Sequence, residues 1–138
     1  MDEFISHSVK ETEDFAEDFS KNLNGNEIIA LYGGLGVGKT AFTRGLARGL
    51  GVEDNVSSPT FAIVNEYAGS PNLYHFDMYR IESWNDLYSI GFFDYIGNGV
   101  VVVEWSENIE AALPDDAIRI EIQNGISENE RIIKIEEI

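Results

Sequence analysis

The chain has 138 residues, of which 43% are hydrophobic and 12% aromatic, and it contains no cysteine. This length and composition predict one folded domain over residues 1–138, and they exclude a disordered chain, disulfide bonds and thiol catalysis. Twenty-five acidic residues against nine basic ones give a net charge of −16. Because binding to RNA or DNA requires Lys and Arg to neutralise phosphates, we do not expect this chain to bind nucleic acid on its own.

The N-terminal segment MDEFISHSVK is acidic, whereas a signal peptide begins with basic residues. No apolar run reaches the roughly 18 residues that a membrane-spanning helix needs. We therefore expect a cytoplasmic protein with no membrane partner.

The first predicted elements are a helix over residues 8–23 and a strand over residues 27–32. Phe15, Phe19 and Leu23 recur at four-residue spacing, and Ser8 with Glu11 fits a capping box at the helix start. The segment NGN ends the helix, and the apolar run EIIALY after it is typical of a buried strand.

A glycine-rich loop follows this strand and has the spacing Gly33-x-x-x-x-Gly38-Lys39-Thr40. Glycines allow such a loop to turn its backbone N–H groups inward, and a helix N-terminus after it favours an anion. In this pattern the lysine reaches the β- and γ-phosphates and the threonine hydroxyl binds Mg²⁺. The sequence therefore predicts a triphosphate site with these residues: Gly33, Leu35, Gly36, Val37, Gly38, Lys39, Thr40 and Ala41.

The next helix is predicted from about Lys39 to Leu50, with Phe42, Leu46 and Leu50 buried and Gly51 as a left-handed cap. After it, SSPTFAIVNEY reads as a loop that enters a strand. GSPN then turns the chain back into LYHFDMY, which makes a hairpin.

The second half of the chain adds a short helix in ESWNDLYSIGF and a strand in VVVVEW, whose four valines are typical of burial on both faces. After a short helical stretch, AIRIEIQ and ERIIKIEEI alternate apolar and polar residues, which predicts an antiparallel pair at the edge of the sheet. The predicted fold class is α/β: a three-layer arrangement like that of P-loop NTPases, with a mixed sheet that is parallel at its centre and antiparallel at its margins.

Two acids end apolar strands and are candidates for the metal partner of the phosphate loop. Asp77 ends LYHFD, and Glu104 ends VVVVE. Ligands of an α/β sheet bind at the carboxyl ends of its strands. We keep both acids, with Mg²⁺ held by Thr40 and one of them. Thr60, in the SPT segment, is a weaker candidate for a loop that reaches the γ-phosphate. We expect the lone histidines His7 and His75 to be surface or packing residues.

Four segments in this order, GGLGVGKTAFTRG, NVSSPTFAIVNEY, YHFDMYR and VVEWSE, closely resemble the TsaE family. The members of this family are small bacterial ATPases required for threonylcarbamoyladenosine modification of tRNA. The resemblance extends from about residue 8 to residue 131, and the combination of motifs is specific, whereas the phosphate loop alone is generic. GGLG departs slightly from the Gly-Asp-Leu-Gly form of the family.

The resemblance implies an ATPase that acts on a complex of two other proteins, one of which transfers the threonylcarbamoyl group to adenosine 37 of ANN-decoding tRNAs. It implies that Thr40 and Glu104 bind Mg²⁺ and that Asp77 and Thr60 lie at the γ-phosphate. The catalytic candidates are therefore Asp77, Glu104 and Thr60. The resemblance further places Val9 near the adenine and Arg131 near the nucleotide.

Three other classes of P-loop protein are alternatives. A small-molecule kinase carries arginines in a lid over its acceptor, and no insertion of this chain has a cluster of them. A GTP-dependent switch needs an Asn-Lys-x-Asp segment to read guanine, and the sequence has none. A nucleotide-binding protein without hydrolysis is compatible with the same residues.

Overall fold

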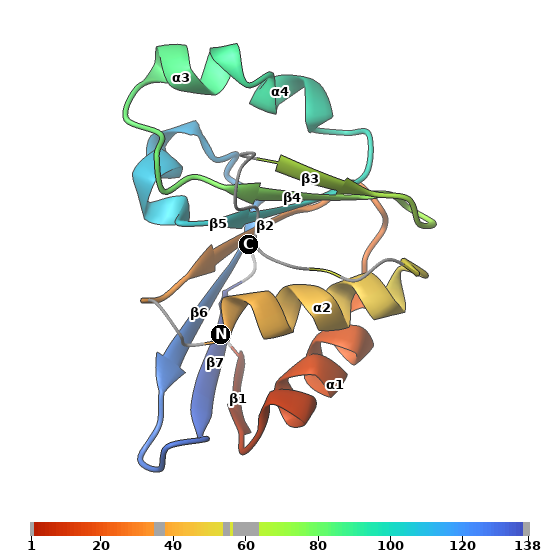
Figure 1. Ribbon diagram of the computed structural model, residues 1–138, viewed down its shortest axis with the longest axis vertical. Coiled ribbons are helices and arrows are strands. Elements are labelled where there is room, and N and C mark those ends of the chain that lie inside the picture. Colours follow the sequence, from red (N-terminus) through yellow and green to blue (C-terminus); the bar gives the residue numbers. More distant parts are fainter. Residues whose placement is uncertain (1, 35–37, 54–55, 57–63, 137–138) are drawn as a thin grey trace.

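A mixed sheet of seven strands runs through the molecule (Figure 1). The computed structural model describes residues 2–34, 38–53, 56 and 64–136. Along the sheet the strands follow the order β1-β7-β6-β2-β5-β4-β3. They are β1 (Asp2–Ser6), β2 (Ile28–Tyr32), β3 (Val64–Tyr67), β4 (Leu73–Asp77), β5 (Val100–Glu104), β6 (Ile118–Asn124) and β7 (Arg131–Glu136). The four central strands are parallel, and β3, β7 and β1 add antiparallel pairs, which confirms the predicted fold class.

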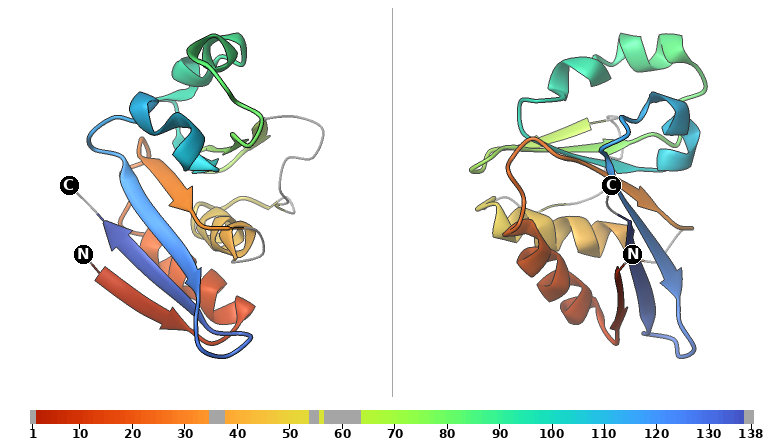
Figure 2. Two further views of the ribbon diagram at one scale, coloured as in Figure 1. Left: turned by 90° about the vertical axis from the view of Figure 1, so that its left-hand side faces the viewer. Right: turned by 180° about the vertical axis from the view of Figure 1, so that it is seen from behind.

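Helices cover the two faces of this sheet. The helices α1 (Val9–Ser20) and α2 (Lys39–Gly49) lie together on one face, and α3 (Trp84–Ser89) and α4 (Phe92–Tyr95) lie on the other (Figures 1 and 2). The 3₁₀ helix η1 (Ser106–Ala112) follows β5 and packs on the same side as α3. The protein therefore has three layers.

The valines of β5 explain why one strand can serve both layers. Successive side chains of a strand point to opposite faces. Val100 and Val102 belong to the core under α1 and α2, whereas Val101 and Val103 belong to the core under α3 and α4. Every residue of β5 is buried, as the valine run predicts.

The two helices of the first layer approach each other closely. Phe42 and Leu46 of α2 are fully buried as predicted, and Phe15 of α1 packs against Phe42. Glycine at position 45 permits this approach, because a Cβ atom there would lie 2.2 Å from the carbonyl oxygen of Glu13 and 2.7 Å from the Cβ atom of Ala16. Such distances are far below normal contact, so only glycine fits.

The capping box predicted at the start of α1 forms in part. The Ser8 hydroxyl accepts the N–H of Glu11 at 3.0 Å. The Glu11 carboxylate does not return to Ser8 but accepts the N–H of His7 at 3.1 Å. At the end of α2, Gly51 has a φ of 77°, which confirms the predicted left-handed cap.

One prediction about the strands is wrong. The pair β6–β7 does not form the edge of the sheet, because β1 pairs with the outer side of β7 and β6 pairs with β2. The strand β1 is short and acidic. Its Phe4 stacks on Phe15 of α1 with 4.4 Å between the ring centroids, so the side of β1 that carries Phe4 faces α1. The short helix predicted within 82–92 is confirmed as α3, and Gly91, with a φ of 72°, begins the separate helix α4.

Candidate functional site

The two ends of the glycine-rich loop join β2 to α2, as the sequence predicts. Gly33 has a φ of 139° and Gly38 a φ of 105°, values that L side chains rarely adopt. Gly38 is the N-cap of α2 and offers no side-chain acceptor to the first turn of that helix. The N–H groups of this turn and the positive end of the helix dipole therefore face the loop, an arrangement suited to a phosphate.

Three predicted loop residues, Leu35, Gly36 and Val37, lie outside the described residues, and so does Thr60 of the SPT segment. The described part of the predicted phosphate site therefore consists of Gly33, Gly38, Lys39, Thr40 and Ala41.

Lys39 is nearly buried, with 5% of its surface exposed. Its ammonium donates to the carbonyl oxygen of Gly33 at 2.8 Å and lies 4.4 Å from the centroid of the Trp105 ring. Trp105 directly follows β5 and has a φ of 59°, and its ring also packs edge-on against Tyr79 at 4.9 Å. Lys39, the first residue of α2, is thus held by Gly33, which follows β2, and by Trp105, which follows β5.

The two predicted acids are partners in the sheet. Asp77 and Glu104 lie opposite each other in the parallel register of β4 and β5. β5 is the direct neighbour of β2, and β4 lies one strand further away, which adds about 4.8 Å of strand spacing. Glu104 is therefore the acid on the strand next to the one that carries the loop.

Both acids point to the face that α2 covers. By strand alternation, Glu104 shares its side with Val102, and Asp77 shares its side with Leu73, and both of these apolar residues belong to the core under α1 and α2. Glu104 is 6% exposed, whereas Asp77 is half-buried and accepts the N–H of Tyr79 at 2.9 Å. The structure brings the two carboxylates together on the loop side of the sheet.

His75 contacts one member of this pair, Glu104, and the sequence did not predict this contact. Its side chain is fully buried, and its Nε2 contacts the carboxylate of Glu104. His75 is two residues before Asp77 and therefore lies on the same face of β4. The two-residue spacing of His75 and Asp77 can be read from the sequence and places both on one face of the strand. The contact with Glu104 depends on how β4 aligns with β5.

Hydrogen bonds of Asn108 and Glu110 tie η1 to the ends of β4 and β2. Asn108 of η1 donates to the carbonyl oxygens of Met78 at 2.9 Å and Tyr79 at 3.2 Å, so it ties the end of β4 to η1. The hydroxyl of Tyr32, the last residue of β2, donates to the carboxylate of Glu110. Burial and this neighbouring carboxylate raise the pKa of Tyr32 well above its usual range, so the hydroxyl stays protonated.

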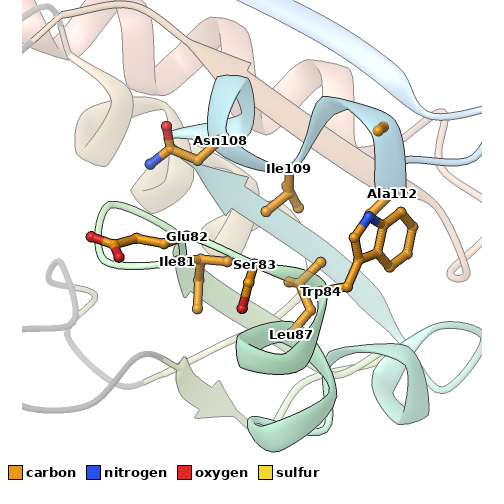
Figure 3. A pocket seen from close by; sticks show the side chains of 9 residues that line it. Ile81, Glu82, Ser83, Trp84, Leu87, Asn108, Ile109 and Ala112 are labelled. Atoms are coloured by element: carbon orange, nitrogen blue, oxygen red, sulfur yellow. The ribbon is translucent and has the colours of Figure 1, made fainter.

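A small pocket of about 150 Å³ lies beside Asn108, between α3 and η1 (Figure 3). Its lining includes Trp84, Leu87 and Ile109. Leu87 and Ile109 belong to the core on the side of the sheet away from α2. The pocket is therefore separate from the candidate nucleotide site.

Val9 and Arg131 lie at the end of the sheet where β2 and β6 finish, which is also the end that carries the glycine-rich loop. Arg131 begins β7 and pairs with Asn124, the last residue of β6, and β6 is parallel to β2. Val9 begins α1 and is 60% exposed. Arg131 donates to the carbonyl oxygens of Glu128 at 2.7 Å and Glu130 at 2.9 Å, so these contacts lie within its own hairpin.

Within the described residues there is no group of three or more His, Asp or Glu side chains that could hold a metal ion. Magnesium is commonly bound by one or two protein oxygens together with substrate phosphates, which suits Thr40 and a single carboxylate. In the same part of the chain, no helix is long and apolar enough to cross a membrane.

Comparisons with known proteins show which family the chain resembles. The sequence model of the family described as "Threonylcarbamoyl adenosine biosynthesis protein TsaE" matches residues 6–133. The tRNA threonylcarbamoyladenosine biosynthesis protein TsaE of Aquifex aeolicus is 38% identical over 138 residues, covering 98% of this chain and 96% of that protein. The TsaE protein of Treponema pallidum is 36% identical over 120 residues, covering 86% of this chain and 89% of that protein.

A solved structure has the same fold. The crystal structure of YdiB from Bacillus subtilis superposes with a TM-score of 0.73 at 33% identity, covering 95% of this chain and 81% of that one. The resemblance found from the four sequence motifs is thereby confirmed. The chain belongs to the TsaE family of tRNA threonylcarbamoyladenosine biosynthesis proteins.

Proposed function

We propose that this protein is a single-domain cytoplasmic ATPase required for threonylcarbamoylation of adenosine 37 in ANN-decoding tRNAs. It acts on a complex of two other proteins that performs the transfer. One observation carries the nucleotide part of the proposal: buried Lys39 lies at the start of α2, beside Gly33 and next to the strand that ends in Glu104. The family assignment supports the part that concerns tRNA modification.

Within this proposal, the glycine-rich loop and the first turn of α2 bind the phosphates of ATP. Lys39 donates to the β- and γ-phosphates, and Thr40 and Glu104 hold Mg²⁺. When bound, Mg²⁺ neutralises the charge on the phosphates. Asp77 and Thr60 orient the attacking water at the γ-phosphate.

Two residues at the same sheet edge complete the proposed nucleotide site. Val9 is exposed at the start of α1, where it can pack on the adenine. Arg131 approaches the nucleotide from the start of β7, which requires its side chain to leave the carbonyl oxygens of its own hairpin.

The net charge of −16 supports a role directed at proteins. A surface with this charge repels the phosphates of tRNA, so the partner proteins must carry the tRNA. A partner with a basic face would associate quickly with this chain, because opposite charges steer encounter.

Reconstitution tests the proposed function. The chain is combined with its two partner proteins, tRNA, ATP and a threonylcarbamoyl donor, and modified adenosine and released phosphate are measured. We expect modification to require both the wild-type chain and ATP, and to fail with the Lys39→Ala variant. Modification that proceeds equally without the chain would refute the proposed role. Phosphate transfer to a small molecule would indicate a kinase, and modification without phosphate release would indicate a nucleotide-dependent binding protein.

A further inference from the structure

The contact between His75 and Glu104 is a buried polar pair at the candidate metal site. His75 of β4 faces Val102 in the register of the two strands, so Glu104 is its diagonal neighbour on the same face. His75 is 0% exposed and Glu104 is 6% exposed. A buried carboxylate is costly without a hydrogen-bond donor, and Nε2 of His75 is positioned to be that donor.

The other nitrogen of the ring indicates which nitrogen donates. Nδ1 of His75 is buried and has no hydrogen-bond partner within the described residues. If Nδ1 carried a proton, an N–H donor would be buried without an acceptor, which costs more than leaving a lone pair unpaired. The arrangement therefore favours Nε2 as the ring nitrogen that donates to Glu104.

We propose that His75 is a positioning residue that holds the Glu104 carboxylate in the orientation required to bind Mg²⁺. This inference rests on the proposed function, in which Glu104 and Thr40 hold the metal. Glutamate has three rotatable side-chain bonds, so a carboxylate at the end of a strand can adopt several orientations. A donor on one of its oxygens restricts these orientations and leaves the other oxygen for the metal.

The alternative is that His75 only fills space in the core. Two variants separate the readings. His75→Gln keeps an N–H donor at nearly the reach of Nε2, whereas His75→Leu has a similar volume but no donor. His75→Met is a second apolar variant of unbranched shape, for use if the leucine variant unfolds. The melting temperature of each variant checks that it is folded.

The test measures the affinity of each folded variant for a fluorescent ATP analogue in EDTA and across a Mg²⁺ titration. We expect all variants to bind equally in EDTA. We expect an apparent Mg²⁺ affinity about 10–100-fold weaker in His75→Leu, with recovery in His75→Gln, as for other residues that orient metal ligands. An unchanged Mg²⁺ titration in His75→Leu, or an equal loss in His75→Gln, would overturn the proposal.

A second measurement does not depend on ATP. The ¹⁵N spectrum of the histidine side chains contains two residues, and a His7→Asn variant assigns them. We expect a proton on Nε2 of His75, and a ring without a proton on Nε2 would refute the donor assigned here. If the wild-type chain fails to bind ATP, the proposed function is refuted, while this spectrum still decides the hydrogen bond.

Discussion

The ammonium of Lys39 lies 4.4 Å from the centroid of the Trp105 ring while it donates to the Gly33 carbonyl oxygen at 2.8 Å. A cation–π contact is worth about 0.5–2 kcal/mol, and a hydrogen bond to a charged group about 1.5–3 kcal/mol. Bonds from Lys39 to two phosphates therefore outweigh the contact with the ring. The lysine is held near its proposed working position without being trapped there.

Replacing Lys39 by alanine should weaken ATP binding tenfold or more, because each lost charge-assisted hydrogen bond costs about 1.5–3 kcal/mol. Calorimetry with Mg²⁺ and ATP measures this change. Lys10→Ala is the control, since Lys10 is exposed on α1 and pairs with Asp14. Equal affinity of the wild-type and Lys39→Ala proteins would refute the phosphate site.

In a Trp84→Phe background, Trp105 is the remaining tryptophan, and its fluorescence emission should change when ATP draws Lys39 away from its ring.

Substitutions of Glu104 and Asp77 should differ in how much they change the Mg²⁺ dependence of ATP binding. Glu104→Ala should weaken ATP binding in Mg²⁺ and leave binding in EDTA nearly unchanged, because Glu104 is proposed to contact the metal. Asp77→Ala should reduce hydrolysis more than binding. Glu107→Ala is the matched control, since this exposed acid follows closely in η1. If Asp77→Ala shows the metal-dependent loss and Glu104→Ala does not, the assigned roles are reversed.

Replacing Gly45 by alanine should destabilise the protein, although alanine is the better helix former. Alanine gains up to about 1 kcal/mol in a helix interior. The added Cβ atom meets the Glu13 carbonyl oxygen and Ala16, and overpacking of this kind costs about 1–3 kcal/mol. Thermal unfolding measures the balance. Asn85→Ala on the exposed side of α3 reports the gain in helix propensity alone. A higher melting temperature for Gly45→Ala would show that the helices separate easily.

Glu27 should contribute stability that disappears in acid. Burial tends to raise its pKa, but the N–H groups of Asn24, Gly25 and Asn26 donate to its carboxylate and lower the pKa below the usual value. The folded state therefore binds this proton less tightly than the unfolded state, whose pKa is about 4.3. The contribution is present above that pH and is lost as the pH falls below it.

Glu27→Gln should accordingly lower the melting temperature at pH 7, with a deficit that narrows below pH about 4. Glu53→Gln, at an exposed position after α2, controls for the loss of one negative charge. A deficit of the same size at both pH values would exclude the ionised carboxylate as its cause.

The parts of the site that the sequence predicted depend on local signals. The apolar run of β2, the spacing of Gly33 and Gly38, and the first turn of α2 all lie within residues 28–42. The valines of β5 likewise indicate burial on both faces, and Glu104 follows them directly. In each case neighbouring residues determine the local conformation, so no knowledge of distant contacts is needed.

The parts that it did not predict depend on contacts between distant segments. β1 has few apolar residues, and it becomes a strand because it pairs with β7, from Asp2 opposite Ile135 to Ser6 opposite Arg131. The contact between His75 and Glu104 requires the register of β4 on β5. Sequence spacing indicates which face of a strand a residue occupies, but not which neighbour it meets there.

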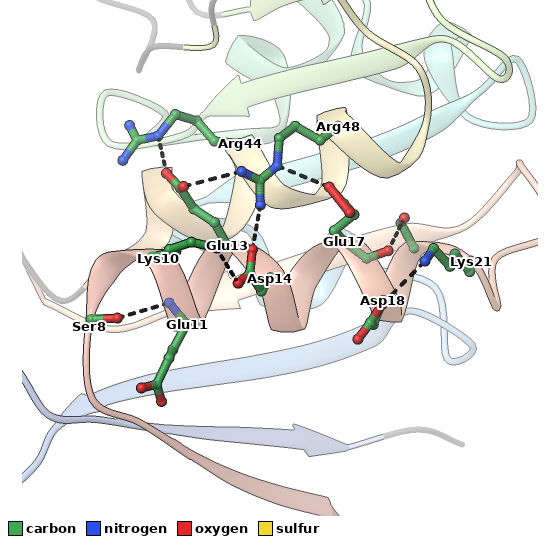
Figure 4. Close-up of polar contacts among 11 residues, drawn as sticks. Ser8, Lys10, Glu11, Glu13, Asp14, Glu17, Asp18, Lys21, Arg44 and Arg48 are labelled. Atoms are coloured by element: carbon green, nitrogen blue, oxygen red, sulfur yellow. Dashed lines mark hydrogen bonds and ion pairs between the residues drawn. The ribbon is translucent and has the colours of Figure 1, made fainter.

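The chain has five arginines, and most of them lie in contacts with other residues. Arg44 and Arg48 of α2 point to the acids of α1 and form ion pairs with them (Figure 4). Arg119 is paired with Glu110. Arg131 donates to carbonyl oxygens of its hairpin, and Arg80 is exposed three residues after Asp77. Within the described residues, Arg44, Arg48 and Arg119 are therefore engaged by carboxylates.

Hydrolysis by the isolated protein should be slow, and its partner complex should accelerate it. Phosphoryl transfer requires positive charge around the γ-phosphate, and a supplied arginine contributes on the order of a thousandfold or more. The ion pairs of Arg44 and Arg48 hold the side chains of these two α2 arginines against the acids of α1. A net charge of −16 leaves few other cations. Single-turnover hydrolysis should be measured for the chain alone and with its two partner proteins. Arg80→Ala tests whether the nearest exposed arginine contributes in either state. A fast rate for the isolated chain, unchanged by the partners, would indicate a self-sufficient ATPase or a kinase and would contradict the proposed dependence on the complex.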